Sequence, residues 1–175
     1  MAIRMNLEEQ LKFYLLIYKF QKKMAIDYGD KRIGLSLTDP LNIIASPFQT
    51  LKNDSEIFLN IAKICREKDV ISIVIGIPSN SENKIGFSAK KVIKFMNGLI
   101  DFLNKENLKI SFFEQDESFS TKEAYSTMAQ IRVKNKNKKN IVDSIASANI
   151  LRDFINSKKK ILYDYEKYKK IIEQG

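Results

Sequence analysis

Two periods of apolar residues alternate along the chain, and this alternation predicts an α/β fold. Short runs rich in β-branched residues are separated by longer stretches in which apolar residues recur every three or four positions. The predicted strands cover residues 24–28, 32–38, 48–51, 71–77 and 110–113. The predicted helices cover about 55–68, 87–105, 121–130 and 141–156. This order favours a single-domain mixed sheet that is flanked by helices on both faces.

The strongest strand pattern is the apolar run over residues 71–77, which Pro78 ends. Such an unbroken run is typical of a central strand that is buried on both faces. Gly29-Asp30 indicates a hairpin between the first two strands. The polar residues at 53–55 provide N-cap chemistry for the first long helix.

The two ends of the chain differ from the central region. Residues 1–23 have apolar side chains at helical spacing, which predicts an amphipathic helix ahead of the main domain. Met24 directly precedes the first strand, so translation from Met24 is a second hypothesis for this extension. We expect the main domain over 24–156 and a basic C-terminal tail over 157–175, either an appended helix or a frayed end.

Composition excludes several kinds of chemistry. The chain has no histidine and one cysteine, so a Ser-His-Asp triad, a Cys-His pair and an ordinary zinc site are excluded. Catalysis would have to use carboxylates, lysines or hydroxyls. No apolar run approaches the roughly 18 residues of a membrane span, and no signal peptide is evident. We therefore expect a soluble cytoplasmic protein without a membrane partner.

The net charge of +9 favours an anionic partner. Residues 1–23 and 156–175 contribute +3 each, and residues 24–155 contribute the remaining +3. Within the main domain the positive charge is densest in one predicted loop, formed by Arg132, Lys134, Lys136, Lys138 and Lys139. This loop has no interleaved aromatic residue, which favours sequence-independent phosphate contacts, although a solubilising loop is the alternative.

Three acidic residues are candidates for a divalent-metal site. Asp27 lies in the first predicted strand, Glu117 just after the last, and Asp143 in the first turn of the final long helix. In a ribonuclease H-like core, which has this order of elements, those three places meet at one end of the sheet. Hydrolysis of a phosphodiester with Mg²⁺ needs carboxylates that converge in this way.

Each of these acids also has a structural interpretation. Asp27 could bond to the backbone of the following turn, or pair with Lys31 or Arg32. Glu117 could be a solvated acid within an acidic cluster. Asp143 could complement the dipole of its helix. The metal-site prediction therefore depends on the three residues together.

Four segments, taken in order, resemble the YqgF/RuvX family of Holliday-junction-resolvase-like proteins, also described as pre-16S rRNA processing nucleases. The segments are MAIDYGDKRIGLSLTD (24–39), IVIGIPSNSENKIGFSAKKVIKF (73–95), EQDESFSTKEA (114–124) and KKNIVDSIASANIL (138–151). The resemblance implies a ribonuclease H-like fold and a nuclease that uses two Mg²⁺ or Mn²⁺ ions. It implies a nucleic-acid substrate, with precursor rRNA preferred and branched DNA open.

The resemblance also implies roles for individual residues. Asp27 matches the first-strand metal aspartate, and Glu117 matches the glutamate of the family's Asp-Glu-Arg segment. Asp143 matches the helix aspartate that precedes a run of small residues. The chain departs from the family at Ser118, where the family has arginine. Lys31, Arg32 and the basic loop are candidates to replace that cation at the phosphate backbone.

Two other classes of protein are consistent with the sequence. A non-catalytic nucleic-acid-binding module fits the mildly basic main domain and the absent arginine. An actin-like phosphotransferase shares the opening aspartate-glycine hairpin, but its two lobes need a longer chain. The protein could be a monomer or a homodimer, and a symmetric DNA junction would favour the dimer.

Overall fold

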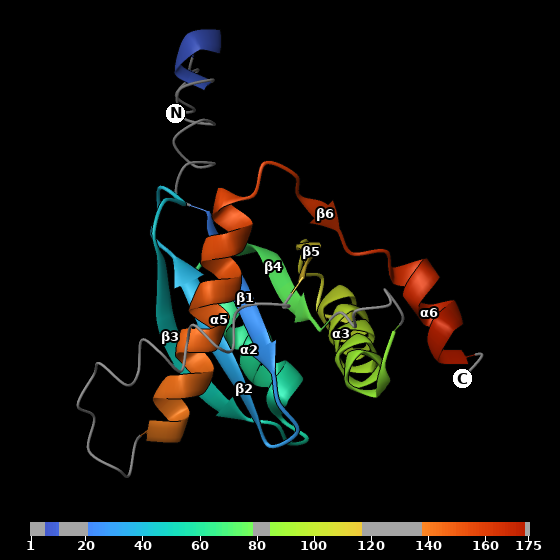
Figure 1. Cartoon of the computed structure of the whole chain (residues 1–175). Helices are drawn as coiled ribbons and strands as arrows, with labels where there is room; N and C mark the ends of the chain where they lie inside the picture. The colour runs from blue at the N-terminus through green and yellow to red at the C-terminus, as the bar shows by residue number, and fades with distance from the viewer. Residues whose placement is uncertain (1–5, 11–20, 79–84, 117–137, 174–175) are drawn as a thin grey trace.

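A six-stranded mixed sheet forms the centre of the protein (Figure 1). The computed structural model describes residues 6–10, 21–78, 85–116 and 138–173. The strands are β1 (Lys22–Tyr28), β2 (Arg32–Thr38), β3 (Ala45–Lys52), β4 (Val70–Ile77), β5 (Ser111–Asp116) and β6 (Ile161–Leu162). Their spatial order is β3-β2-β1-β4-β5-β6. The pairs β1–β4 and β4–β5 are parallel and the other three are antiparallel, which confirms the predicted mixed sheet.

Helices cover both faces of this sheet, as predicted. They are α2 (Ile57–Glu67), α3 (Phe87–Lys105), α5 (Lys138–Asn156) and α6 (Tyr165–Glu173). In Figure 1, α5 crosses the near face, α2 lies behind the sheet, and α6 lies beside α3. The molecule is thus a single α/β domain with α5 in one layer and α2 and α3 in another.

Alternating side chains of the central strands build one core on each face. Met24 and Ile26 of β1 enter the larger core, which α2 and α3 cover. Ala25 of β1 and Val74 of β4 point to the other face and pack against α5. Burial on both faces explains the unbroken apolar run in β4.

Several element bounds differ from those predicted. β3 begins at Ala45, earlier than residue 48, and most of its side chains are exposed, so its apolar signal is weak. β5 continues through polar residues to Asp116. α5 begins at Lys138, which puts Asp143 in the second turn. The expectation of a first-turn Asp143 is therefore wrong, and the helix dipole, strongest at the first turn, explains this acid less well.

The residues after 156 contribute to the fold. β6 pairs with β5, and α6 lies against α3. Tyr163 and Tyr168 are buried, with ring centroids 4.8 Å apart. The Tyr163 hydroxyl donates to Asn97 Oδ1 at 2.9 Å. The interpretation as an appended helix is confirmed for α6, and the preceding β6 was not predicted.

The N-terminal extension is described in part. Residues 7–10 are helical, and the rest of the predicted helix ahead of residue 21 lies outside the described residues, as does the predicted helix over 121–130. β1 begins two residues before Met24. The Lys22 amide donates to the Asp69 carbonyl at 3.0 Å, and the Lys23 amide donates to Thr38 Oγ1 at 2.9 Å.

Candidate functional site

Asp27 lies near the carboxyl end of β1 and is half-buried. Ala25, two residues earlier, packs against α5. Since strand side chains alternate, Asp27 belongs to the same face of the sheet. Its cross-strand partner is Gly34 of β2, and directly opposed residues share a face. Both relations direct the Asp27 side chain toward α5.

Gly34 lets α5 approach the sheet at this level. A β-carbon on Gly34 would lie 2.0 Å from the backbone oxygen of Asp143, so only glycine fits without a shift of the helix. The small residues that follow Asp143 are also buried, namely Ser144, Ala146, Ser147 and Ala148. The Ser147 hydroxyl donates to the Ser144 carbonyl at 2.9 Å. The prediction that this run serves close packing of the helix is confirmed.

The close contact brings Asp143 to the part of the sheet from which Asp27 projects. Asp143 lies in the helix that packs on Gly34, and Asp27 is the residue opposite Gly34. Two of the three predicted metal ligands are therefore neighbours on one face of the sheet, although 116 positions separate them in the sequence.

Arg32 holds the Asp143 carboxylate. Arg32 Nε donates to Asp143 Oδ2 at 2.6 Å, and the two side chains are 35% and 23% exposed. A charge-assisted bond of this length fixes the orientation of the carboxylate. One sequence interpretation paired Arg32 with Asp27, whereas the bond here is to Asp143. The prediction that Arg32 contacts phosphate stays a prediction.

The donor chemistry of the two aspartates fits a hard divalent cation. Mg²⁺ and Mn²⁺ prefer carboxylate oxygens, and one carboxylate has about four acceptor positions, more than Arg32 Nε uses. Glu117, the third predicted ligand, lies outside the described residues, one position beyond the end of β5. Within the described part of the chain no three His, Cys, Asp or Glu residues are grouped closely enough to hold a metal. The complete ligand set stays a prediction.

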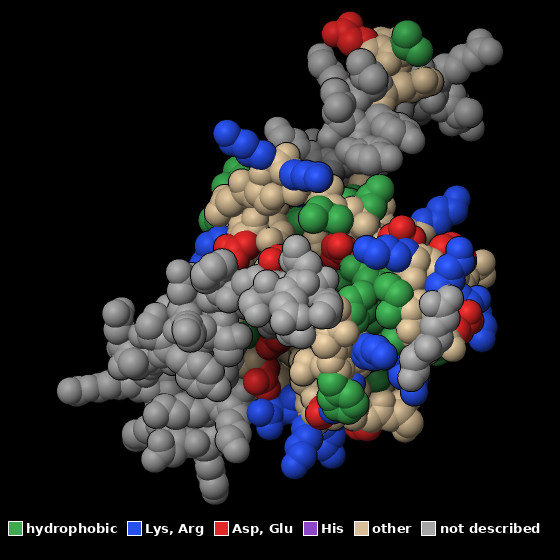
Figure 2. All heavy atoms as spheres, turned by 45° about the vertical axis from the view of Figure 1, so that its right-hand side comes forward, with side chains coloured by type: hydrophobic (Ala, Val, Ile, Leu, Met, Phe, Trp, Pro, Cys, Tyr) green, Lys and Arg blue, Asp and Glu red, His purple; other side chains and the backbone are tan. Residues whose placement is uncertain are grey.

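The predicted phosphate-binding cations are described only in part. Lys31 is exposed at the turn between β1 and β2. Lys138 and Lys139 form the first turn of α5, with side chains that are not described, and Arg132, Lys134 and Lys136 lie outside the described residues. On the face in Figure 2, the described Lys and Arg side chains lie at separate places among acidic ones. This distribution agrees with a mildly basic main domain.

Two acids outside the predicted metal site, Asp30 and Asp39, have partners of their own. Asp30 Oδ2 accepts a bond from Lys91 Nζ at 2.6 Å, and this bond is the main reason that the pKa of Asp30 is lowered. Asp39 accepts bonds from the amides of Ile43 and Ile44, and these bonds lower its pKa. Asp39 holds the structure of its own turn, whereas Asp30 links the hairpin to α3.

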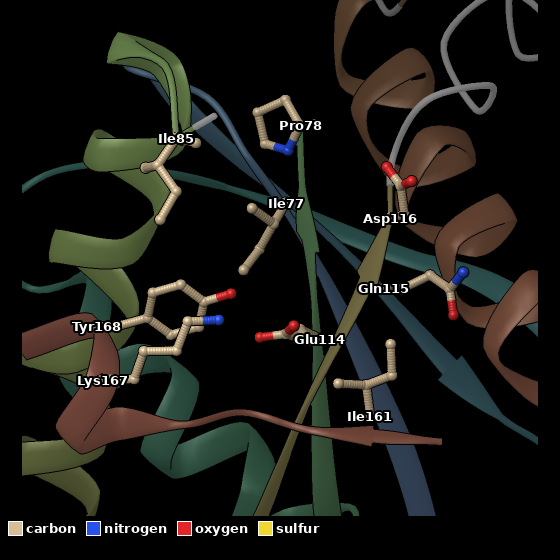
Figure 3. A pocket seen from close by; sticks show the side chains of 10 residues that line it. Ile77, Pro78, Ile85, Glu114, Gln115, Asp116, Ile161, Lys167 and Tyr168 are labelled. Atoms are coloured by element: carbon tan, nitrogen blue, oxygen red, sulfur yellow. The ribbon is translucent and has the colours of Figure 1, made fainter. Parts of the chain in front are cut away.

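A cavity beside the carboxyl ends of β4 and β5 was not predicted (Figure 3). Glu114 of β5 and Lys167 and Tyr168 of α6 line it. The sequence gives only a weak signal for it, a tyrosine and a lysine in a basic tail. Lys167 and Tyr168 of α6 lie beside β5 because the two-residue strand β6, just before α6, pairs with β5.

In the ranges that the structure describes, no helix combines the length and apolarity needed to cross a membrane.

Solved structures with the same architecture define the class of this protein. RuvC of Thermus thermophilus in complex with Holliday junction substrate matches with a TM-score of 0.53 and 10% identity, over 82% of this chain and 99% of that chain. A second Thermus thermophilus RuvC structure matches with a TM-score of 0.51 and 9% identity, over 82% and 100%. The likeness establishes the ribonuclease H-like fold that the sequence predicted.

Sequence relatives define the family within this class. The model of the RuvX family, described as Holliday junction resolvase, matches residues 21–157. The chain belongs to this family, which confirms the resemblance seen in its motifs. An Acetivibrio thermocellus protein named "Putative pre-16S rRNA nuclease" is 34% identical over 142 residues, 79% of this chain and 98% of the relative. A protein of that name from Malacoplasma penetrans is 33% identical over 138 residues, 79% and 96%. By family, the chain is a nuclease.

Proposed function

We propose that this protein is a divalent-metal-dependent endonuclease that processes the precursor of 16S rRNA in the cytoplasm. Asp27, Glu117 and Asp143 are the proposed ligands of two Mg²⁺ or Mn²⁺ ions. The observation that carries the proposal is the contact of α5 with Gly34, which brings Asp143 to the face from which Asp27 projects. The preference for precursor rRNA rests on the names of the relatives.

Some residues of the chain position the proposed metal ligands, and others supply positive charge for the phosphate backbone. Asp27 is fixed by a strand with a fully buried core on each side. Arg32 orients the Asp143 carboxylate through the bond at 2.6 Å. When bound, the ions supply an activated water and stabilise the leaving oxygen. The proposed contacts to the phosphate backbone come from cations around the site, namely Lys31, Arg32, Arg132, Lys134, Lys136, Lys138 and Lys139.

Cleavage of a four-way DNA junction is the second candidate function. The family description and the RuvC complex with a Holliday junction favour it. A junction has two equivalent strands to cut, so this function calls for a homodimer, whereas RNA processing is open to a monomer.

A non-catalytic nucleic-acid-binding role is the third candidate, because Ser118 replaces the arginine of the family motif. A guanidinium is nevertheless present beside the proposed metal ligands, since Arg32 bonds to Asp143. Arg32 could fulfil part of the role of the absent arginine, which supports an active nuclease.

The test is cleavage of a labelled precursor 16S rRNA fragment and of a four-way DNA junction by the full chain. Each substrate is incubated with Mg²⁺, with Mn²⁺ or with EDTA. We expect cleavage of the RNA with either metal, no cleavage in EDTA, and a loss of at least about a hundredfold in Asp27→Asn. Gel-shift binding of the same RNA should remain in Asp27→Asn.

Asp30→Asn is the matched control, because Asp30 lies in the same hairpin but bonds to Lys91. It should cleave like the wild type. Cleavage of the junction alone would establish the second candidate. Binding of RNA without cleavage by the wild type, with any metal, would contradict the nuclease and favour the non-catalytic role.

A further inference from the structure

A cavity of about 380 Å³ opens on the face of the sheet opposite to α5. It lies between the carboxyl ends of β4 and β5, the start of α3, and the β6–α6 segment (Figure 3). Its walls are largely apolar and include Ile77, Pro78, Ile85 and Ile161. The volume is within the range of small-molecule sites, which combine apolar walls with a few convergent polar groups.

Three polar groups converge in this cavity. Figure 3 shows the side chains of Glu114, Lys167 and Tyr168 directed toward one another across it. The Tyr168 hydroxyl lies close enough to the Glu114 carboxylate to raise the pKa of Tyr168. Lys167 Nζ lies 5.0 Å from the centroid of the Tyr168 ring. A carboxylate and an ammonium group therefore both line the cavity between apolar walls.

Tyr168 remains a hydrogen-bond donor at every physiological pH. Burial raises the pKa of Tyr168, and the nearby Glu114 carboxylate raises it further. The hydroxyl faces the Glu114 carboxylate as a donor, and the carboxylate, with about four acceptor positions, keeps acceptor capacity on both oxygens.

The cavity lies close to the proposed cleavage site, across the edge of the sheet. Glu114 is in register with Ile75 of β4, which is in register with Ile26 of β1. Asp27 is the next residue along β1. Adjacent strands are about 4.8 Å apart, so the row from Ile26 to Glu114 spans about 10 Å. Glu114 and Asp27 therefore lie near each other along the sheet, on its opposite faces and close to the carboxyl ends of their strands.

We propose that this cavity binds one unpaired guanine base of the nucleic-acid substrate, an inference that rests on the proposed nuclease function. The Watson–Crick edge of guanine presents two adjacent N–H donors and a carbonyl oxygen. Glu114 accepts the two donors, Lys167 donates to the carbonyl, and Ile77 and Pro78 contribute apolar surface for the base. Adenine and cytosine present a single amino group beside a ring acceptor, and uracil has one N–H between two carbonyls.

The cavity depends on residues outside the region that the family shares. The family match ends at residue 157, whereas Ile161, Lys167 and Tyr168 belong to the segment that follows. The cavity therefore combines Glu114, inside the matched region, with residues beyond it.

The first experiment measures binding of GMP, IMP, AMP and CMP to the full chain by isothermal titration. We expect GMP to bind most tightly and IMP, which lacks the exocyclic amino group, to bind roughly tenfold more weakly. Glu114→Gln should weaken the binding of GMP by at least about tenfold, because the amide offers one acceptor oxygen where the carboxylate offers two. Lys167→Met, at an exposed position, should weaken GMP severalfold without a risk to folding. Glu67→Gln, an exposed acid of α2, should leave GMP binding unchanged.

Equal binding of GMP and AMP, or no binding of GMP, would overturn the guanine site. A cleavage assay separates this inference from the proposed function. The wild type should cut RNA whose unpaired guanines are replaced by inosine more slowly than the guanine-containing RNA. Glu114→Gln should cut these two RNAs at the same rate. If the wild type cuts no substrate, the nuclease proposal fails and GMP titration still tests the cavity. If it cuts RNA without regard to guanine, the cavity assignment alone fails.

Discussion

Gly34 sets the distance between α5 and the sheet at the proposed active site. Its missing side chain leaves room for the backbone of Asp143, and its strand partner is Asp27. The approach of Asp143 to Asp27 thus depends on a residue that takes no part in chemistry. The sequence places Asp27 and Asp143 by motif, but the reason for their proximity is visible only in the packing.

Gly34→Ala should damage both stability and activity. The new β-carbon would lie 2.0 Å from the Asp143 oxygen, so α5 must move outward. We expect a loss of about 1–3 kcal/mol in the free energy of unfolding. Cleavage should fall by about a hundredfold at a temperature where the variant is folded, because a displacement near 1 Å misaligns the carboxylates. Urea denaturation and the RNA cleavage assay measure the two effects.

Gly98→Ala is the control for this variant. Its β-carbon would meet only the ring of Phe58, at 3.1 Å, and the ring can adjust. Replacing glycine by alanine stabilises a helix by about 1 kcal/mol, which offsets the cost of moving the ring. We therefore expect the free energy of unfolding of Gly98→Ala to change by less than about 1 kcal/mol, and its cleavage rate to stay the same. Equal losses of activity in the two variants would contradict the role of Gly34.

Cys65 should be unreactive in the folded protein. Burial raises the pKa of its thiol from 9.0 to about 12, so the reactive thiolate is roughly a thousandfold rarer than in the unfolded chain at pH 8. Alkylation by iodoacetamide, followed by mass spectrometry, should be slower by about that factor in buffer than in urea. The folded state holds the thiol proton of Cys65 more tightly than the unfolded chain does. Ionisation of Cys65 therefore lowers the free energy of unfolding as the pH rises from 9 toward 12. Comparable alkylation rates in both solvents would contradict the burial.

At the scale of elements, the sequence predicted the strands that are buried on both faces of the sheet. β1, β2 and β4 are buried on both sides and have clear apolar runs. β3 is mostly exposed, so its first residues gave no signal. β6 has two exposed residues and depends on pairing with β5, a long-range contact without a local pattern. The guanine cavity was missed for the same reason, since α6 reaches it only through β6.

Lys160 should stabilise the end of α5. Its Nζ donates to the carbonyls of Phe154, Ile155 and Ser157, at 3.0 Å for Ile155, and lies 4.7 Å from the Phe154 ring centroid. A cation here satisfies terminal carbonyls and complements the helix dipole. Lys160→Met should lower the free energy of unfolding by about 1 kcal/mol. Lys158→Met, at an exposed position, should be neutral in the same urea denaturation, and equal effects would rule out the cap.

At the scale of the whole molecule, the sheet carries a different part of the proposed function on each face. α5 brings Asp143 to Asp27 on one face, and α6 closes the cavity around Glu114 on the other. Both places lie at the carboxyl edge of the parallel strands β1, β4 and β5. Ligands commonly bind at this edge in α/β sheets, which agrees with the position of both proposed sites.

The N-terminal extension provides the last test, because the family match and β1 begin before Met24. A chain that starts at Gln21 keeps the bonds from the amides of Lys22 and Lys23, and its Gln21 carbonyl still accepts from Asn42 Nδ2 at 2.9 Å. A chain that starts at Met24 loses these bonds, at about 1 kcal/mol each. We expect the first truncation to unfold like the full chain within about 1 kcal/mol, and the second to lose about 3 kcal/mol.

Light scattering on the full chain and on the Gln21 truncation then measures the molar mass of each, which shows whether the extension or the domain makes any subunit contact. A dimer that becomes a monomer on removal of residues 1–20 would place the subunit contact in the extension, and such a dimer would suit a symmetric junction. An unchanged mass would assign the oligomeric state to the domain itself. Equal stability of the Met24 and Gln21 truncations would contradict the contribution of residues 21–23 to β1, and would leave translation from Met24 compatible with a complete fold.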